Sequence, residues 1–287
     1  MADPVAGYRL MGIVNVTPDS FSDGGRFFTA DAAIEQGLLL AQEGAAILDV
    51  GGESTRPGAE PVGAEEELRR VQPVVEGLAA TAWPEGAPQI SIDTSKASVA
   101  SAALTAGASL VNDVSALRAD PEMAAVVADA RADCCLMHML GEPRTMQQDP
   151  RYDDVVDEVK AFLLERMEFA VDAGIGEQQL LLDPGIGFGK TVDHNLQLLQ
   201  RLDELVALGR PIVIGSSRKS FLGRIAASGP DSARLAGTIA TNVLALERGA
   251  SVFRVHDVAP LREALALAAA TLAGRWTGSA KTTTTRI

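Results

Sequence analysis

The chain has 287 residues, of which 47% are hydrophobic, and this is enough to bury a large core. Its 38 acidic and 25 basic residues give a formal net charge of −13. We therefore expect no nucleic acid and no membrane as a partner, because nucleic acids and anionic membranes bind basic surfaces. The longest apolar stretches are too short to span a membrane, and residues 1–10 lack the basic segment and apolar core of a secretory signal. Composition therefore indicates a cytoplasmic protein.

The only two cysteines, Cys134 and Cys135, are adjacent and lie in an apolar run. This spacing suits neither a structural disulfide nor a zinc site, so we expect both thiols to be reduced core residues.

Apolar runs alternate with amphipathic or Ala/Leu-rich stretches along the whole chain. We predict strands at residues 10–14, 46–50, 89–92, 110–112, 134–137, 180–182, 211–214 and 251–255. We predict helices at residues 31–43, 64–79, 96–106, 121–130, 154–173, 193–208, 233–248 and 259–273. Eight successive strand–helix units predict an α/β fold, a single (β/α)8 TIM barrel over residues 1–276, with an open doubly wound sheet as the alternative. Residues 277–287 are polar, and we expect a disordered tail.

Polar side chains stand at the end of nearly every predicted strand. In a barrel these carboxyl ends meet on one face, where ligands bind. Some of the polar residues, such as Thr94 and Ser95, can instead cap the following helix. The pattern favours one converging pocket, formed by Asn15, Asp49, Asp93, Asn112, His138, Asp183, residues 216–219, Arg254 and His256.

Two early loops carry hydroxyl groups and glycines. In residues 15–25, Asn15 can offer an amide oxygen to Mg²⁺, although a hydrogen-bonded turn at Pro18 and Asp19 explains the composition equally well. Residues 49–58 suit a loop that closes on a charged substrate, and the alternative is a solvated surface loop. There we expect Asp49 to contact a ligand or a metal-bound water, and Glu53 to stabilise the loop.

Three later segments offer groups for a heterocycle and an anion. Asp93, Asn112 and Asp183 can accept hydrogen bonds from the amidine-like edge of a heterocycle, although each acid alone can be a helix cap or a salt-bridge partner. Lys219 and Ser220 stand at the start of a helix, where an anion can bind. Further anion-binding groups are expected on the last strand, where alternation places Arg254 and His256 on the same side.

The stretch Pro184-Gly-Ile-Gly-Phe-Gly-Lys190 matches neither common phosphate-binding pattern. A P-loop would need a glycine where Pro184 stands, and a dinucleotide fingerprint would need its last glycine one position later than Gly189. We expect the glycines to bring the backbone close to a ligand, with Phe188 as an apolar wall. His194 is interpreted as structural, and the role of His138 stays open.

Eight sequence strings occur in the same order as in the dihydropteroate synthases: NVTPDSFSDGG, DVGGESTRPG, SIDT, NDVSAL, MHMLGEPRTMQ, DPGIGFGK, SRKSFLG and RVHDV. Over residues 10–258 the chain therefore resembles this family. The resemblance implies a homodimeric transferase that joins (7,8-dihydropterin-6-yl)methyl diphosphate to 4-aminobenzoate, giving 7,8-dihydropteroate and diphosphate. It also implies Mg²⁺ as cofactor and competitive inhibition by sulfonamides. The chain departs from the family at Leu140, where Gln is usual, and at Ala97 and Ser98, where Pro-Glu is frequent.

The resemblance also assigns roles to residues. Pterin would be bound by Asp93, Asn112, Met137, Asp183, Phe188, Gly215, Lys219 and Arg254. The 4-aminobenzoate would be bound by Phe21, Thr55, Arg56, Pro57, Lys219 and Ser220. Diphosphate would be bound by Asn15, Thr55, Arg254 and His256, and the metal by Asn15. The catalytic groups would be Asp93, Asp183, Lys219, Arg254 and His256.

The chemistry that these residues suit is a largely dissociative substitution. Buried carboxylates can stabilise positive charge on the pterin, while cationic groups stabilise the departing diphosphate. Neither cysteine ends a strand, so we expect no covalent enzyme intermediate. The alternatives are a pterin-binding methyltransferase barrel and a catalytically silent pterin-binding barrel.

Overall fold

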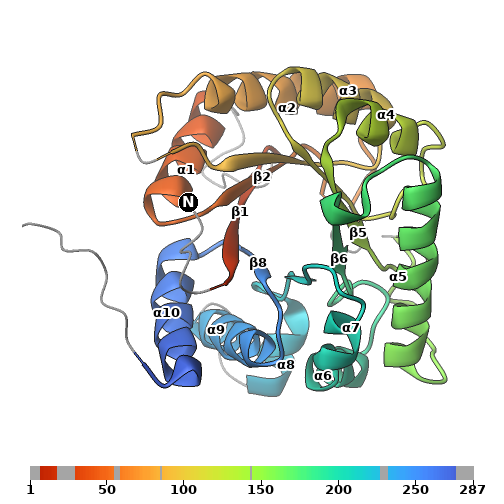
Figure 1. The fold of residues 1–287 in the computed structure, drawn as a ribbon, viewed down its shortest axis with the longest axis vertical. Coiled ribbons are helices and arrows are strands. Elements are labelled where there is room, and N and C mark those ends of the chain that lie inside the picture. The colour runs from red at the N-terminus through yellow and green to blue at the C-terminus, as the bar shows by residue number, and fades with distance from the viewer. Residues whose placement is uncertain are drawn as a thin grey trace, which may run out of the picture.

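A computed structural model of the chain describes residues 7–17, 30–54, 59–84, 86–142, 144–226 and 232–275 (Figure 1). Eight parallel strands form one sheet in the order β6-β5-β4-β3-β2-β1-β8-β7. The two end strands meet through a single bridge between Leu182 and Ile212, so the sheet curls into a nearly closed barrel. The strands are β1 Arg9–Asn15, β2 Ile47–Gly51, β3 Gln89–Asp93, β4 Leu110–Asp113, β5 Asp133–Met137, β6 Leu180–Asp183, β7 Val213–Ile214 and β8 Val252–Val255.

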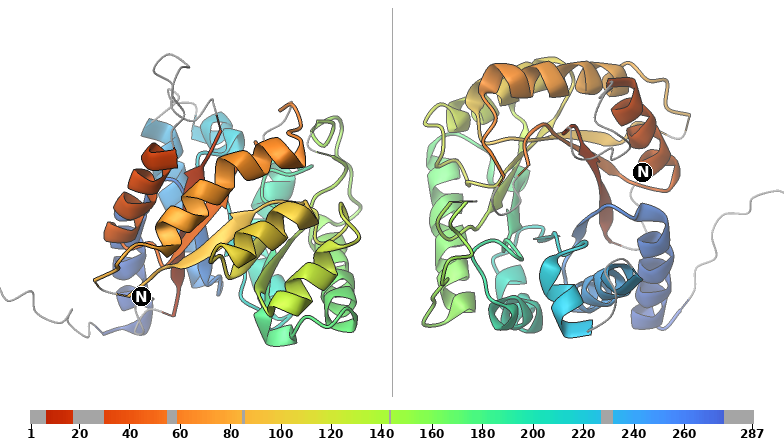
Figure 2. Two further views of the ribbon diagram at one scale, coloured as in Figure 1. Left: turned by 90° about the horizontal axis from the view of Figure 1, so that it is seen from above. Right: turned by 180° about the vertical axis from the view of Figure 1, so that it is seen from behind.

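Helices surround this barrel on its outside, as the views in Figure 2 show. The predicted barrel is confirmed, and the open doubly wound sheet is not found. The helices are α1 Ala30–Gln42, α2 Ala64–Ala79, α3 Ala97–Thr105, α4 Met123–Ala130, α5 Val155–Asp172, α6 Val192–Gln200, α7 Leu202–Val206, α8 Ser220–Ala226, α9 Ser232–Glu247 and α10 Val258–Ala273, with a short 3-10 helix at Glu177–Gln179.

The barrel interior is built in layers along the strands. One apolar layer fills the middle of the barrel, and its members are Met11, Ile47, Leu110, Cys135, Leu181, Val213 and Val252. Because side chains alternate with a period of two along a strand, the residues two positions further on point to the same interior. Those residues are Ile13, Asp49, Asn112, Met137, Asp183, Gly215 and Arg254. An apolar plug therefore lies beneath a layer rich in polar and charged groups, at the carboxyl end of the barrel.

Both cysteines lie inside β5 and are fully buried as free thiols. Burial raises the pKa of each thiol above its ordinary value, so neither is a ready thiolate. This confirms the prediction of reduced core residues away from the strand ends.

The predicted helix at residues 193–208 is divided into α6 and α7 at Arg201. The Arg201 side chain pairs with Asp154 at 2.7 Å and Glu204 at 2.7 Å, which holds the break. Helix α8 is an additional short element between β7 and α9. The tail at residues 277–287 lies outside the described residues. In the part of the chain that the structure describes, no helix is both long and apolar enough to cross a membrane.

Candidate active site

Arg254, on β8, is the centre of a buried charge network at the barrel's carboxyl end. Its guanidinium donates from Nε to Asp49 Oδ2 at 2.6 Å and from a terminal nitrogen to Asp93 Oδ2 at 2.6 Å. Asp49 is fully buried and also accepts hydrogen bonds from Ser91 Oγ at 2.6 Å and Asn112 Nδ2 at 3.0 Å. Asp49 is not among the residues that line the pocket, and both of its oxygens accept hydrogen bonds from protein donors. The expectation that Asp49 contacts a ligand or a metal-bound water stays a prediction.

Asp93 ends β3 and lines the pocket. Burial raises the pKa of its carboxyl to about 7, against the attraction of Arg254. The negative charges of Asp49 and Glu67 act in the same direction as burial. The site therefore contains an acid that titrates near neutrality beside a guanidinium shared with a second acid. Such perturbed groups gather at functional sites.

Asp183 ends β6 and is almost completely buried. Its Oδ1 accepts a hydrogen bond from the Gly185 N–H at 2.7 Å, and burial raises the pKa of the carboxyl while the Lys219 charge opposes this. A Cβ on Gly215 would lie 3.9 Å from Asp183 Oδ2, so the absence of a side chain there leaves space over the carboxyl. Lys219 Nζ lies 4.0 Å from the centre of the Phe188 ring, a cation–π contact across the pocket.

His138, whose role the sequence left open, contacts a buried lysine. Lys190 Nζ lies 2.9 Å from His138 Nδ1 and donates to the Phe188 carbonyl oxygen at 3.0 Å. Burial lowers the pKa of Lys190 to about 7. Burial, together with the Lys190 charge, lowers the pKa of His138 to about 2. His138 is thus a neutral imidazole at ordinary pH. Its Nδ1 accepts a hydrogen bond from Lys190 when the lysine is protonated, because an ammonium group can only donate.

His256 follows β8 and is held by the segment that follows β7. Its Nδ1 lies 3.0 Å from Ser217 Oγ, and its backbone N–H donates to the same oxygen at 3.2 Å. Next to this contact, Arg218 donates from Nε to Asp257 Oδ2 at 2.9 Å. Helix α9 supports the segment from behind, since the Arg218 N–H donates to Thr238 Oγ1 at 3.1 Å. These contacts fix Lys219 and His256 relative to each other.

The root of the loop after β2 is tied to α2 and to the segment after β3. Lys96 Nζ pairs with Glu53 and with Glu67 Oε2 at 2.5 Å, and Glu67 is fully buried. Glu53 Oε1 also accepts a hydrogen bond from the Val62 N–H at 3.0 Å. The expectation that Glu53 stabilises the loop is confirmed.

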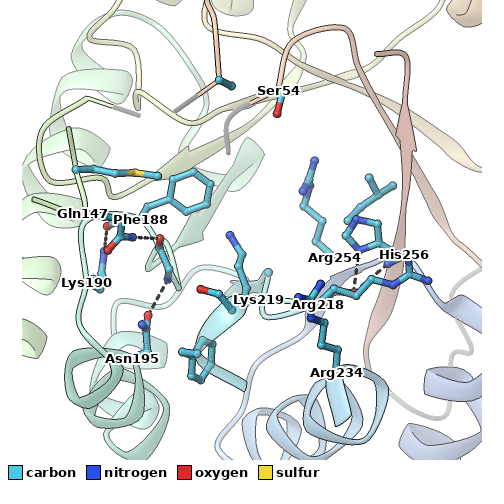
Figure 3. A pocket seen from close by; sticks show the side chains of 18 of the residues that line it. Ser54, Gln147, Phe188, Lys190, Asn195, Arg218, Lys219, Arg234, Arg254 and His256 are labelled. Carbon is cyan, nitrogen blue, oxygen red and sulfur yellow. Dashed lines mark hydrogen bonds between the residues drawn. The ribbon is translucent and has the colours of Figure 1, made fainter. Parts of the chain in front are cut away.

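These side chains surround an open pocket of about 1620 Å³, larger than the ~300–1,000 Å³ of ordinary small-molecule sites. In Figure 3, Phe188, Gln147 and Lys190 lie on one side and Arg254 and His256 on the other, with Lys219 between them. Of the residues that the family resemblance assigned to the site, eight line this pocket: Asn15, Asp93, Phe188, Gly215, Lys219, Ser220, Arg254 and His256.

Three predicted pterin-binding residues lie just behind this lining, namely Asn112, Met137 and Asp183, which are 4%, 4% and 5% exposed. Met137 packs in a cluster with Met139, Met146 and Phe188. The predicted contacts Phe21, Thr55, Arg56 and Pro57 lie outside the described residues.

The pocket also contains residues to which the sequence reasoning gave no role. Met146 and Gln147 reach it from the segment after β5, and Lys190 lines it as well. These three lie in the strings MHMLGEPRTMQ and DPGIGFGK, which could have indicated them. Ser217 and Arg218, which the strand-end pattern had placed in the converging pocket, also line it.

Asn15 ends β1, is half-buried and lines the pocket. Among the described residues its side-chain amide has no hydrogen-bond partner, so its oxygen is open to a ligand. The described residues contain no group of three or more His, Cys, Asp or Glu side chains that could hold a metal. One amide oxygen does fit Mg²⁺, which commonly takes one or two protein ligands and completes its shell with substrate phosphates and waters.

Comparison with known proteins gives a consistent family. The profile of the family described as "Pterin binding enzyme" matches residues 11–256. The dihydropteroate synthase of Escherichia coli strain K12 is 46% identical to the chain over 269 residues, which is 93% of each protein.

Solved structures of this kind superpose over nearly the whole chain. The Xanthomonas albilineans dihydropteroate synthase with 4-aminobenzoic acid has a TM-score of 0.86 and 50% identity, covering 94% of each chain. The same enzyme in complex with 7,8-dihydropteroate has a TM-score of 0.83 and 48% identity, over 94% of this chain and 95% of that one. A Yersinia pestis dihydropteroate synthase with a sulfonamide drug complex has a TM-score of 0.87 and 43% identity, over 94% and 96%.

Proposed function

The chain belongs to the pterin-binding enzymes and, within them, to the dihydropteroate synthase family, and from this we propose how its own residues carry out the transfer. The protein is a transferase, and its product is 7,8-dihydropteroate. We propose that (7,8-dihydropterin-6-yl)methyl diphosphate and 4-aminobenzoate react in the barrel pocket. The observation that carries this is the Arg254 network, because it places acids and a guanidinium together at one end of an otherwise apolar barrel.

The pterin is proposed to bind over Asp93, Asn112 and Asp183. A carboxylate accepts paired hydrogen bonds from an amidine-like edge, and Asp183 is the acid whose Oδ2 faces the open space above Gly215. Phe188 supplies an apolar face for a flat ring, and the Lys219 ammonium lies over that face. The pocket thus matches a heterocycle that is flat, polar at its edges and electron-rich.

The diphosphate is proposed to bind near Arg254, His256 and Asn15, which all line the pocket. Arg254 supplies positive charge there, and Asn15 supplies an amide oxygen. Asn15 would hold Mg²⁺ through that oxygen. When bound, Mg²⁺ would neutralise charge on the diphosphate and so favour its departure. The 4-aminobenzoate carboxylate is proposed to meet the first turn of α8 at Ser220, where backbone N–H groups and Lys219 attract an anion.

The reaction breaks the bond between the methylene carbon and the diphosphate oxygen, forms a bond from the arylamine nitrogen to that carbon, and releases one proton from the amine. Positive charge develops on the pterin as the first bond breaks, and Asp93 and Asp183 stabilise that charge. No covalent enzyme intermediate is proposed, because the described pocket lining contains no cysteine and both thiols are buried in β5.

Three further properties belong to this proposal. We propose that the protein is cytoplasmic and that it forms a homodimer, as its family resemblance implies. We also propose that sulfonamides compete with 4-aminobenzoate, since a Yersinia pestis relative has been solved with such a drug.

The test mixes the purified protein with the pterin diphosphate, Mg²⁺ and 4-aminobenzoate, and measures diphosphate release. Release should require the amine, and a sulfonamide should raise the apparent KM for 4-aminobenzoate without changing kcat. Pterin binding without release would support the catalytically silent barrel, and methyl transfer to a corrinoid would support the methyltransferase alternative.

A further inference from the structure

The glycine-rich segment from Pro184 to Lys190 forms one wall of the pocket but has little rigidity of its own. Gly185, Gly187 and Gly189 all have positive φ angles, of 68°, 84° and 63°. Phe188, the residue that faces the pterin pocket in the proposed function, lies between two of these glycines. Its position must therefore come from contacts with other parts of the chain.

Three consecutive carbonyl groups of this segment accept hydrogen bonds from side chains. The Gly187 oxygen accepts from Gln147 Nε2 at 2.5 Å, and the Gly189 oxygen accepts from the Tyr152 hydroxyl at 2.8 Å. The Phe188 oxygen between them accepts from Lys190 Nζ at 3.0 Å. Gln147 is exposed and Tyr152 is half-buried, so Lys190 is the only fully buried donor of the three.

Lys190 reaches from this segment to the end of the neighbouring strand. Its Nζ lies 2.9 Å from Nδ1 of His138, the residue that follows β5. Lys190 and His138 are 3% and 5% exposed. His138 is held in turn by an edge-to-face contact with Phe162, 4.8 Å between ring centres. The lysine therefore links the Phe188 backbone to a rigid part of the barrel.

The same amine lies next to the Asp183 turn. A Cβ on Gly185 would be 3.5 Å from Lys190 Nζ and 1.9 Å from the His138 carbonyl oxygen, so Gly185 must lack a side chain for the three segments to meet. The charged groups that act on Lys190 are Asp183 and Lys219. With Lys190 titrating near 7 and His138 neutral, the amine donates to two acceptors that are already in place.

We propose that Lys190, held by His138, is a positioning residue that fixes the Phe188 backbone and the turn after Asp183, and so controls pterin binding. This rests on the proposed function only in taking the pocket's ligand to be a pterin. Its hydrogen-bond partners are His138 and the Phe188 carbonyl oxygen. In Figure 3, Lys190 and Phe188 lie on the opposite side of the pocket from Arg254 and His256. Loss of the Lys190 side chain should therefore weaken the binding of the pterin much more than the binding of 4-aminobenzoate.

The first experiment compares Lys190→Met with Lys160→Met, a control on the outer helix α5. Binding of the non-reacting probe 6-hydroxymethylpterin is followed by fluorescence, and the KM for 4-aminobenzoate is measured separately. Lys190→Met should weaken the probe about tenfold, as expected for a lost buried hydrogen-bond donor. The KM for 4-aminobenzoate should change less than twofold, and Lys160→Met should change neither. Unchanged probe affinity, or an equal loss for both ligands, would overturn the proposal.

The second experiment varies His138 and remains decisive if Lys190→Met does not fold. His138→Asn keeps an acceptor near the Nδ1 position, whereas His138→Leu removes it. The Asn variant should retain most of the probe affinity and the Leu variant should lose it, and equal affinities in the two would refute the proposal. In the Lys190→Met/His138→Leu double variant, the loss of binding free energy for the probe should be well below the sum of the losses in the two single variants. Probe binding does not depend on turnover, so absence of diphosphate release in the wild type would count against the proposed function and not against this inference.

Discussion

At the scale of single residues, the site depends on one guanidinium shared by two acids. Arg254 lies between Asp49, which is completely buried, and Asp93, which faces the pocket. Both carboxylate oxygens of Asp49 accept hydrogen bonds from protein donors, so Asp93 is the acid of this pair that faces the pocket. The two carboxylates therefore differ in role because of what surrounds them.

The raised pKa of Asp93 predicts a pH dependence of stability. The group has an ordinary pKa of 3.8 and a pKa of about 7 in the fold, so between these values the folded state holds a proton that the unfolded chain has lost. The free energy of unfolding should therefore fall as the pH rises from about 4 to about 7. We expect the difference in the free energy of unfolding between wild type and Asp93→Asn, measured by urea denaturation, to fall as the pH rises across this range. A difference that does not vary with pH would contradict it.

Replacing Asp183 tests the proposed pterin contact directly. Asp183→Asn puts an N–H group where a carboxylate oxygen would accept, so pterin binding should weaken by roughly 1–3 kcal/mol, which is about 5- to 150-fold. Fluorescence titration with a pterin measures this. Asp203→Asn, on the outer helix α7, is the matched control. If Asp183→Asn binds the pterin as tightly as wild type does, the assignment is wrong.

At the scale of elements, the segments after the strands are held mainly by one another. The segment after β7 is fixed to the one after β8 through Ser217 and His256, and the glycine-rich segment after β6 is fixed to the one after β5 through Lys190 and His138. The N-terminus of α3 shows the same principle. The sequence suggested capping by Thr94 or Ser95, but the Ala97 N–H donates to Asp120 Oδ2 at 2.8 Å.

The crowding at the glycine-rich segment predicts a large effect of one methyl group. Gly185→Ala places a Cβ 1.9 Å from the His138 carbonyl oxygen, whereas Gly209→Ala, at a similar positive φ, meets nothing within 4 Å. Both should lose about 1–2 kcal/mol from backbone strain. Gly185→Ala should lose about 1–3 kcal/mol more from overlap. Urea denaturation of the two variants measures the difference, and equal losses would show that the contact is not tight.

At the scale of the whole molecule, the weakest strand pairing among the described residues is between β6 and β7, and we call it the seam of the barrel. Strands β6 and β7 meet through a single bridge, while β1 pairs with β2 over five residues. The proposed pterin site spans that seam, since Asp183 ends β6 and Gly215 follows β7. A ligand bound there would connect the two sides.

Hydrogen exchange should reveal this seam. The Leu182 amide, which donates to Pro211 at 3.0 Å, should exchange faster than amides within β2 and β3. Binding of a pterin should slow exchange at the seam more than at β2, because the ligand contacts both of its sides. Equal exchange rates at Leu182 and at the β2 and β3 amides of the free protein would contradict this. So would slower exchange in the complex at only one of the two strands β6 and β7.

The sequence by itself determined the strands, most helix ends and the polar face of the barrel. These features depend on local periodicity. Because side chains alternate with a period of two along each strand, the sequence alone shows that the apolar interior layer is followed by a polar layer at the strand ends. The resemblance to the dihydropteroate synthases added the family and the expected ligands.

Only the tertiary structure decided which of these polar groups bind each other. Asp49 and Arg254 are 205 positions apart, His138 and Lys190 are 52 apart, and Ser217 and His256 are 39 apart. No local pattern relates residues at such separations. Whether a carboxylate faces the pocket or pairs with an arginine depends on burial and on partners that barrel closure brings together, and this is why the sequence did not show that Asp49 pairs with Arg254.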